Sequence, residues 1–283
     1  MYSYITRYQN QILYIVKNKV CSIKGNLDIE HSAELVFING KYIVDSNKSL
    51  YVIDLIGNSL KYLNKLNKPI TSLEVYNTSK GEEKNNEFTV ISDRFGDIFR
   101  VDENNVKLIA GNMCYTTTMI IVNDMIWTGD KYGRIRVSKL NGEIVHYIFT
   151  IKKSITTMIH VGNYVVVGGL YKGLIIVDAN NFEFKFVELN YSFYNLKTFD
   201  NEFFYGASVN KIQKFFLNSD RNIKESETMY LEDSVNIIDF DIYNDKIISL
   251  SSDGKLYENN NLIIDLNTQY NVYFDHIQDK CEK

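Results

Sequence analysis

Three aspartates stand out among the residues that could do chemistry, because each lies in a short turn-like stretch. Asp93, Asp130 and Asp253 occur in the stretches SDRFG, GDKYG and SDG. Two carboxylates could act as acid and base in a glycosidase, but that reaction requires a pair held at a defined separation over one pocket. The sequence offers no such pair, and an aspartate beside a glycine turn usually accepts backbone N–H bonds. We therefore interpret the three residues as turn caps.

The histidines and glycines do not form a recognisable catalytic or metal-binding motif. The histidines are scattered one by one, at His31, His146, His160 and His276. We do not expect such scattered residues to converge on a metal ion. No GxSxG elbow, HExxH motif or P-loop occurs. Gly168, Gly169 and Gly173 superficially resemble a phosphate loop, but no predicted helix follows to bind an anion, so we interpret them as turn glycines.

Two arginines in the stretch RIRVSK at 134–139 break the local pattern of the chain. Strand alternation places Ile135 and Val137 on one face and Arg134 and Arg136 on the other. A strand that is buried on both faces can hold two neighbouring guanidinium groups only if both find partners. The two arginines are therefore the first candidates for a functional site.

Two explanations for these arginines are open at the level of sequence. One is an internal ion-pair network with Asp97, Asp102 or Asp130. The other is a set of acidic residues on a partner protein, because arginine forms bidentate bonds to carboxylates. Arg94, in the equivalent turn one repeat earlier, and Lys131 would extend the same basic patch along the rim.

These residues belong to a unit that recurs about every forty residues, which is the length of a WD-type propeller blade. Each copy has a short apolar run, a turn of about four residues and a second apolar run, and this pattern predicts a β-hairpin. Seven copies can be aligned, at 12–23, 43–54, 89–102, 125–140, 165–178, 204–217 and 247–259.

Further apolar runs before and after the hairpins predict four strands in each unit. Inner strands are predicted within 32–38, 116–122, 155–161 and 235–243, and outer strands within 143–149 and 261–266. The runs alternate only weakly, which is typical of blades packed on both faces. We predict an all-β, seven-bladed WD40-like β-propeller that forms one domain over residues 1–283; two β-sandwiches would not require a regular period. The run at 2–6 could complete the last blade or begin the first.

Composition argues against several classes of function. The formal net charge is -4 and the pI is about 5.7, whereas proteins that bind nucleic acid through their overall field are usually strongly basic. Cys21, Cys114 and Cys281 are few, distant and odd in number, which favours a reducing compartment. No signal peptide and no run of 18 apolar residues is present, so we expect an intracellular protein without a membrane partner.

Two consecutive stretches resemble signatures of the WD-repeat, non-catalytic subunit of tRNA (guanine-N7-)methyltransferase. They are ISDRFGDIFRV at 91–101, similar to a motif ADKxGDV, and WTGDKYGRIRVS at 127–138, similar to TADRDExIRVS. Between them, where the family tends to have a Gly-His pair, this chain has Gly111 followed by Asn112. Tyr132 and Gly133 stand where the family often has acidic residues. The resemblance covers about fifty residues; beyond it, the likeness is architectural.

The resemblance implies a propeller that binds and stabilises a catalytic subunit in a heterodimer. That subunit would bind S-adenosylmethionine and form N7-methylguanosine in the tRNA variable loop, so this chain itself would need no cofactor and have no catalytic residue. By position, Arg136 matches the family's basic residue that pairs with an acidic residue of the catalytic subunit. Arg134 and Lys131 fall on neighbouring motif positions, and Arg94 falls on the lysine of the preceding motif.

The remaining expectations concern location, RNA and the competing hypotheses. The resemblance implies the nucleus, with the cytoplasm as an additional site. Any contact with tRNA would be indirect or weak, through Lys152, Lys153, Lys172 and Lys185. The main alternative is a WD-type adaptor that scaffolds a different intracellular complex. An enzyme with its site at the central channel would require convergent acids or histidines there.

Overall fold

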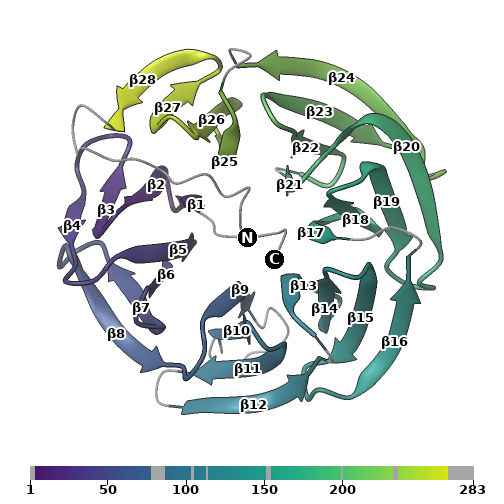
Figure 1. The fold of residues 1–283 in the computed structure, drawn as a ribbon, viewed down its shortest axis with the longest axis horizontal. Helices are drawn as coiled ribbons and strands as arrows, with labels where there is room; N and C mark the ends of the chain where they lie inside the picture. Colours follow the sequence, from purple (N-terminus) through teal and green to yellow (C-terminus); the bar gives the residue numbers. More distant parts are fainter. Residues whose placement is uncertain are drawn as a thin grey trace.

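The protein is a seven-bladed β-propeller, as the repeat predicted (Figure 1). A computed structural model describes residues 4–77, 87–102, 105–112, 114–150, 154–198, 200–231 and 235–266. Seven sheets of four antiparallel strands surround a central axis, and each sheet uses four strands that are consecutive in the chain. We number these sheets blade 1 to blade 7 in chain order.

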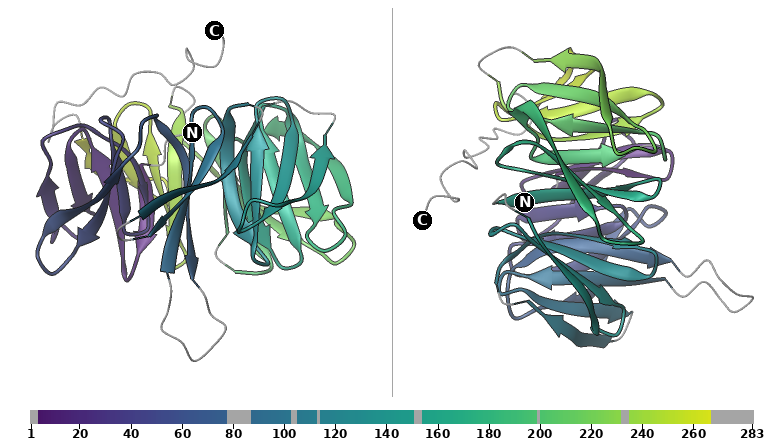
Figure 2. Two further views of the ribbon diagram at one scale, coloured as in Figure 1. Left: turned by 90° about the horizontal axis from the view of Figure 1, so that it is seen from below. Right: turned by 90° about the vertical axis from the view of Figure 1, so that its right-hand side faces the viewer.

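The predicted hairpins are the second and third strands of the blades. The second strands are β2 (Gln11–Val16), β6 (Tyr42–Asp45), β10 (Glu87–Asp93), β14 (Met125–Asp130), β18 (Tyr164–Gly169), β22 (Phe203–Ala207) and β26 (Lys246–Ser251). The third strands are β3 (Lys19–Ser22), β7 (Ser49–Asp54), β11 (Asp97–Asp102), β15 (Arg134–Lys139), β19 (Lys172–Asp178), β23 (Lys211–Leu217) and β27 (Lys255–Glu258). Because the blades repeat one topology, the turns that join these strands share one face of the ring, which we call the turn face (Figure 2).

The inner and outer strands complete each blade. The innermost strands are β1 (Ile5–Tyr8), β5 (Leu35–Asn39), β9 (Ile70–Asn77), β13 (Thr116–Val122), β17 (Ile155–Val161), β21 (Asn195–Thr198) and β25 (Ile237–Tyr243). The outer strands are β4 (Asp28–Glu30), β8 (Ser59–Lys65), β12 (Asn105–Gly111), β16 (Ile144–Phe149), β20 (Phe184–Ser192), β24 (Ile223–Tyr230) and β28 (Asn261–Asp265). Every predicted inner and outer run overlaps one of these strands, and only β5 extends beyond its predicted run, by one residue.

The hydrophobic core is divided among the junctions between blades. In the described residues, seven clusters of buried hydrophobic side chains each join two adjacent blades, including the last and the first. A blade therefore buries both of its faces, which explains the weak alternation of the sequence. The clusters differ in size: the junction of blades 4 and 5 has thirteen buried members, whereas that of blades 3 and 4 has five.

In the described part of the chain, the first and last blades meet without sharing a strand. Ile5–Tyr8 is the innermost strand of blade 1, so the N-terminal run begins the first blade. The backbone N–H groups of Tyr4 and Ile5 donate to Asp239 Oδ2 at 2.7 and 3.0 Å, and the N–H of Arg7 donates to Asp241 Oδ2 at 2.7 Å. Two carboxylates of blade 7 thus satisfy the open edge of blade 1.

Candidate partner-binding site

The turn aspartates of blades 3 and 4 are caps, as predicted. Asp93 Oδ1 accepts the backbone N–H groups of Phe95 and Asp97 at 2.8 and 3.1 Å. Asp130 Oδ1 accepts those of Tyr132 and Arg134 at 2.7 and 3.0 Å. Both carboxylates are buried, so these bonds hold the turns in one geometry.

The turns of blades 7 and 2 also contain aspartates, of which the sequence analysis named Asp253 but not Asp45. Asp253 pairs with Lys255 Nζ at 2.8 Å and accepts a hydrogen bond from the hydroxyl of Ser251. Asp45 of blade 2, which sequence reasoning missed, is 2 % exposed and accepts the N–H of Ser49 at 2.8 Å. Its turn lacks glycine, and Lys48 takes the positive φ of 70° instead, so the usual sequence signal is absent.

Arg134 has an internal partner, in agreement with the first of the two explanations. Its Nε donates to Asp130 Oδ2 at 2.6 Å, and its Nη2 donates to Cys114 Sγ at 2.8 Å. The bonds to Asp130 raise the pKa of Arg134, while burial and the neighbouring carboxylate raise the pKa of the Cys114 thiol. The other two predicted acids are used elsewhere: Asp97 pairs with Lys68 and Asp102 with Arg100.

Arg136 is buried, and its acceptors in the described part of the chain are uncharged. Its residue is 5 % exposed. Nη1 donates to the carbonyl of Gly111 and to Asn112 Oδ1 at 3.0 Å, and Nη2 donates to the carbonyl of Gly142 at 3.2 Å. Its Nε has no partner within the described ranges, and no carboxylate there pairs with the guanidinium. Among the described residues the positive charge therefore has no counter-ion, which is costly in a buried position.

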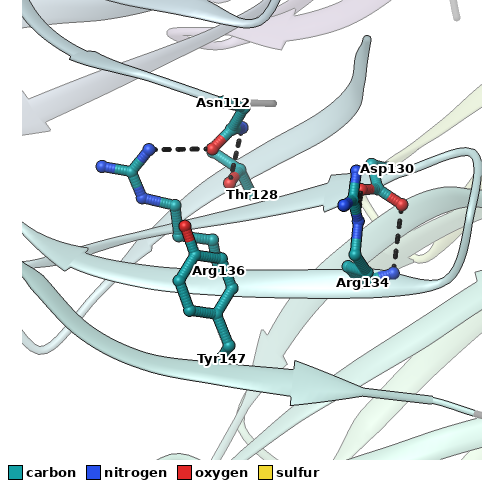
Figure 3. Close-up of a pocket in the computed structure, with 6 residues that line it drawn as sticks. All are labelled: Asn112, Thr128, Asp130, Arg134, Arg136 and Tyr147. Carbon is teal, nitrogen blue, oxygen red and sulfur yellow. Dashed lines mark hydrogen bonds and ion pairs between the residues drawn. The ribbon is translucent and has the colours of Figure 1, made fainter. Parts of the chain in front are cut away.

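A small pocket opens beside these arginines at the junction of blades 3 and 4 (Figure 3). It is lined by Asn112, Thr128, Asp130, Arg134, Arg136 and Tyr147. Asn112 comes from the end of blade 3 and donates to Thr116 and Thr128 at 2.8 and 3.0 Å, so its oxygen is turned toward Arg136. Among the described residues, this junction has the smallest cluster of buried apolar side chains, and polar side chains line the pocket there.

The face assignment made from alternation is confirmed. Ile135 and Val137 are fully buried in the cluster between blades 4 and 5. Arg134 and Arg136 point to the other side, where they pair across the sheet with Phe149 and Tyr147 of β16. Neither Tyr147 nor Asn112 was among the predicted site residues. Asn112 could have been found from the sequence, because it follows Gly111 where the family named in the sequence analysis tends to have a Gly-His pair. Nothing in the sequence pointed to Tyr147.

Arg94 and Lys131 differ from the other two basic residues because they are exposed on the turn face. Arg94 has no recorded side-chain partner in the described part of the chain, and Lys131 lies 5.1 Å from the ring centroid of Tyr132 without an ion pair. The next residue in each turn is an exposed aromatic: Phe95 is 62 % exposed and Tyr132 is 56 % exposed. Two adjacent turns thus present a cation followed by an aromatic ring, and aromatic residues and arginine are enriched in protein interfaces.

The partner-binding role of Arg94, Lys131, Arg134 and Arg136 stays a prediction. The structure brings Arg134 and Arg136 into one pocket and puts Lys131 on the adjoining turn, with Arg94 on the corresponding turn of blade 3. Of the lysines considered for tRNA, Lys172 is exposed on the turn face, and Lys185 of outer strand β20 donates to Asn222, which immediately precedes outer strand β24. Lys152 and Lys153 lie outside the described residues.

His31, His160 and the glycine cluster take part in local packing. His31 lies 3.4 Å from Asp45 and packs edge-on against Tyr51, and burial lowers the pKa of His160. Within the described ranges, no three His, Cys, Asp or Glu side chains are grouped to hold a metal ion, while His276 and Cys281 lie outside them. The assignment of Gly168, Gly169 and Gly173 to a turn is wrong, because Gly168 and Gly169 end strand β18 and Gly173 lies in strand β19. At each, a side chain would collide with a backbone carbonyl, of Phe193, Ser154 or Val187 respectively.

Comparison with known proteins identifies the fold. No protein-family model and no curated protein sequence matches the chain. Among solved structures, a chain of the mitotic checkpoint complex has a TM-score of 0.71 at 11% identity, covering 91% of this chain and 90% of that one. The computationally designed Ika8 protein has a TM-score of 0.62 at 12% identity, covering 91% and 81%. In the described part of this chain, no helix has the length and apolar character needed to cross a membrane.

Proposed function

We propose that this propeller is the non-catalytic subunit of a tRNA (guanine-N7-)methyltransferase and that it binds the catalytic subunit through blades 3 and 4. The two stretches that resemble this family are the two turns, with their following strands, that flank the pocket. Under this proposal, the catalytic subunit holds S-adenosylmethionine and carries out methyl transfer, while the propeller stabilises it, in the nucleus and also in the cytoplasm.

One observation supports the choice of this surface above all: Arg136 is a buried guanidinium without a carboxylate among the described residues. An acidic side chain of a partner, entering beside Tyr147, would supply the missing counter-ion. A charge-assisted bond in such a desolvated pocket is stronger than one at an exposed rim. Arg94 and Lys131 would steer the acidic partner toward the pocket from the exposed turn face.

The first prediction concerns association with the catalytic subunit from the same genome. We expect the double variant Arg94→Glu and Lys131→Glu to bind it at least about tenfold more weakly, because two attractive charges become repulsive. Both side chains are exposed, so the fold should be retained. Titration calorimetry on the purified subunits measures the Kd, and the thermal unfolding midpoint checks the fold.

Lys61→Glu provides the control, because Lys61 is an exposed lysine on outer strand β8 of blade 2. It should leave the Kd within about twofold. If the double variant binds as tightly as the wild type, the turns of blades 3 and 4 do not form the binding surface. Arg136→Glu is a poorer test, since a carboxylate among the oxygens of Gly111, Asn112 and Gly142 would also disrupt the junction.

The functional claim itself is tested by nucleoside analysis of whole tRNA. Cells that lack this protein should lose N7-methylguanosine from tRNA, and re-expression of the wild-type chain should restore it. Intact N7-methylguanosine would overturn the methyltransferase proposal. It would favour an adaptor for a different complex, which uses the same fold and the same exposed turn residues with another partner.

A further inference from the structure

The outer strand of blade 4 differs from the other outer strands in its lack of charge. Among the seven outer strands that the structure describes, β16, with the sequence IVHYIF, alone has no Lys, Arg, Asp or Glu. An outer strand is the open edge of its sheet, and proteins usually protect such edges from pairing with another chain by placing charges on them. β16 lacks this protection.

The same strand exposes large apolar side chains. Ile144 is 50% exposed, Val145 39%, Tyr147 37% and Phe149 66%. Tyr147 and Phe149 lie two residues apart on one face of the strand, with their ring centroids 6.1 Å apart in a stacked arrangement. Ile148, between them, points the other way and is buried in the cluster with blade 5. β16 is therefore anchored by Ile148 on one face and exposes the apolar rings of Tyr147 and Phe149 on the other.

Both flanks of β16 are fixed by neighbouring blades. On one side His146 stacks on Phe182 of blade 5 at 4.9 Å. On the other side Gly142, in the turn before β16, packs so closely on the backbone of Ile109 in blade 3 that no side chain would fit. In the described structure β16 is hydrogen-bonded to one neighbour, β15, so the edge is rigid and open. A rigid edge loses little entropy when another strand pairs with it.

We propose that an extended segment of the partner protein adds to β16 as a fifth strand of blade 4. Its backbone would pair with the edge, and apolar side chains at alternate positions would cover Tyr147 and Phe149. The inference rests on the proposed function in that the propeller acts by binding a protein.

Charge complementarity specifies one end of this segment. Phe149 pairs with Arg134 across the sheet. Just after β16, the backbone is hydrogen-bonded to the turn that contains Lys131. There the N–H of Thr150 donates to Gly133 O at 3.0 Å, and the N–H of Ser154 donates to Lys131 O at 2.8 Å. The end of β16 at Phe149 therefore meets the basic turn face. The partner segment that adds to β16 is therefore extended and apolar, with an acidic residue at the end that lies next to Lys131. The pocket of Arg136 opens beside Tyr147 on the same strand.

Selection from a random peptide display library on the immobilised full chain tests the proposal without a known partner. The enriched peptides should alternate apolar residues and end in an acid, and binding of labelled copies should protect the β16 amides from hydrogen exchange. Phe149→Lys, which places a charge on the edge, should weaken their Kd at least about tenfold. Leu262→Lys makes the same change on β28, where Leu262 is 53% exposed, and should have less than about a twofold effect.

The proposal fails if no peptide is enriched, or if enriched peptides bind Phe149→Lys as tightly as wild type and leave β16 unprotected. It also fails if the catalytic methyltransferase subunit binds wild type and Phe149→Lys equally, although the proposed function would then stand. If peptides bind β16 but the subunit does not bind and tRNA retains N7-methylguanosine, the methyltransferase proposal fails and strand addition stands.

Discussion

Asp93 and Asp130 occupy the same position in consecutive blades, but their carboxylates bind different sets of neighbouring groups. Asp93 accepts two backbone N–H groups. Asp130 accepts two as well and also binds the Arg134 guanidinium and the Cys114 thiol. One residue type thus closes a turn in blade 3 and, in blade 4, both closes the turn and neutralises an arginine of the site.

This difference predicts unequal losses of stability. Asp93→Ala should lower the free energy of unfolding by about 2 kcal/mol, and Asp130→Ala by about 3 kcal/mol, because the second change also leaves Arg134 without its carboxylate. Urea denaturation followed by tryptophan fluorescence measures both values, since Trp127 is buried in the same blade as Asp130. Equal losses would show that the Arg134 bond adds nothing to stability.

At the scale of elements, the turn between β15 and β16 connects the site to blade 3. Gly142 in this turn has φ +91°, its carbonyl accepts from Arg136, and its Cα faces the carbonyl of Ile109. Gly25 in blade 1 also has a positive φ, +72°, but has no atoms within reach of an added side chain. The two glycines therefore separate the cost of backbone conformation from the cost of close packing.

Alanine at these two glycines tests that separation. Gly25→Ala should reduce the free energy of unfolding by about 1 kcal/mol, the usual cost of a positive φ. Gly142→Ala should reduce it by at least about 3 kcal/mol, because the backbone of one blade must also move away from the other. Urea titration of both variants gives the comparison. Similar losses would mean that the contact between Gly142 and blade 3 is easily relaxed.

At the scale of the whole molecule, the innermost strands bring distant charges together around the axis. Burial lowers the pKa of Lys197 on β21, but Asp239, Asp241 and Glu74 more than offset this, so its pKa is raised. Burial also raises the pKa of Glu74 on β9 to about 8, and Lys197 offsets only part of that rise. These groups come from blades 3, 6 and 7, so only the closed ring brings them close enough to shift one another's pKa.

The raised pKa of Glu74 predicts a dependence of stability on pH. Between its ordinary pKa of 4.5 and its folded value of about 8, the folded protein retains a proton that the unfolded chain releases. The contribution of Glu74 to stability is therefore present at low pH and lost as the pH rises through this window. Glu74→Gln should flatten this part of the profile and give a higher urea midpoint than wild type at pH 8.5.

A matched exposed acid provides the control for this profile. Glu188→Gln on outer strand β20 changes the same group at an exposed position and should leave the profile of urea midpoint against pH unchanged. If Glu74→Gln and wild type lose stability in parallel between pH 5.5 and 8.5, Glu74 is already ionised in the folded protein.

Much of the architecture follows from local pattern in the chain. The seven hairpins, the extra strands and the turn roles of Asp93 and Asp130 are visible in the sequence because each depends on residues a few positions apart. Asp45 was missed because its turn has Lys48 in place of glycine, and Gly168 and Gly169 were misplaced because their requirement is a neighbouring backbone rather than a turn. The closure of the ring was also open, since it depends on Asp239 and residues more than 200 positions away.

For the basic residues, the sequence by itself determined that Arg134 and Arg136 share a face and need partners. Only the tertiary structure decided that Arg134 is paired within its own turn and that Arg136 is buried against carbonyls at the junction of two blades. Alternation is a property of one strand, whereas a guanidinium's acceptors come from whichever blades the ring places beside it. That is why the pattern identified the arginines, and only the packing of blade 3 on blade 4 distinguished Arg134, whose charge is paired, from Arg136, which has no carboxylate partner among the described residues.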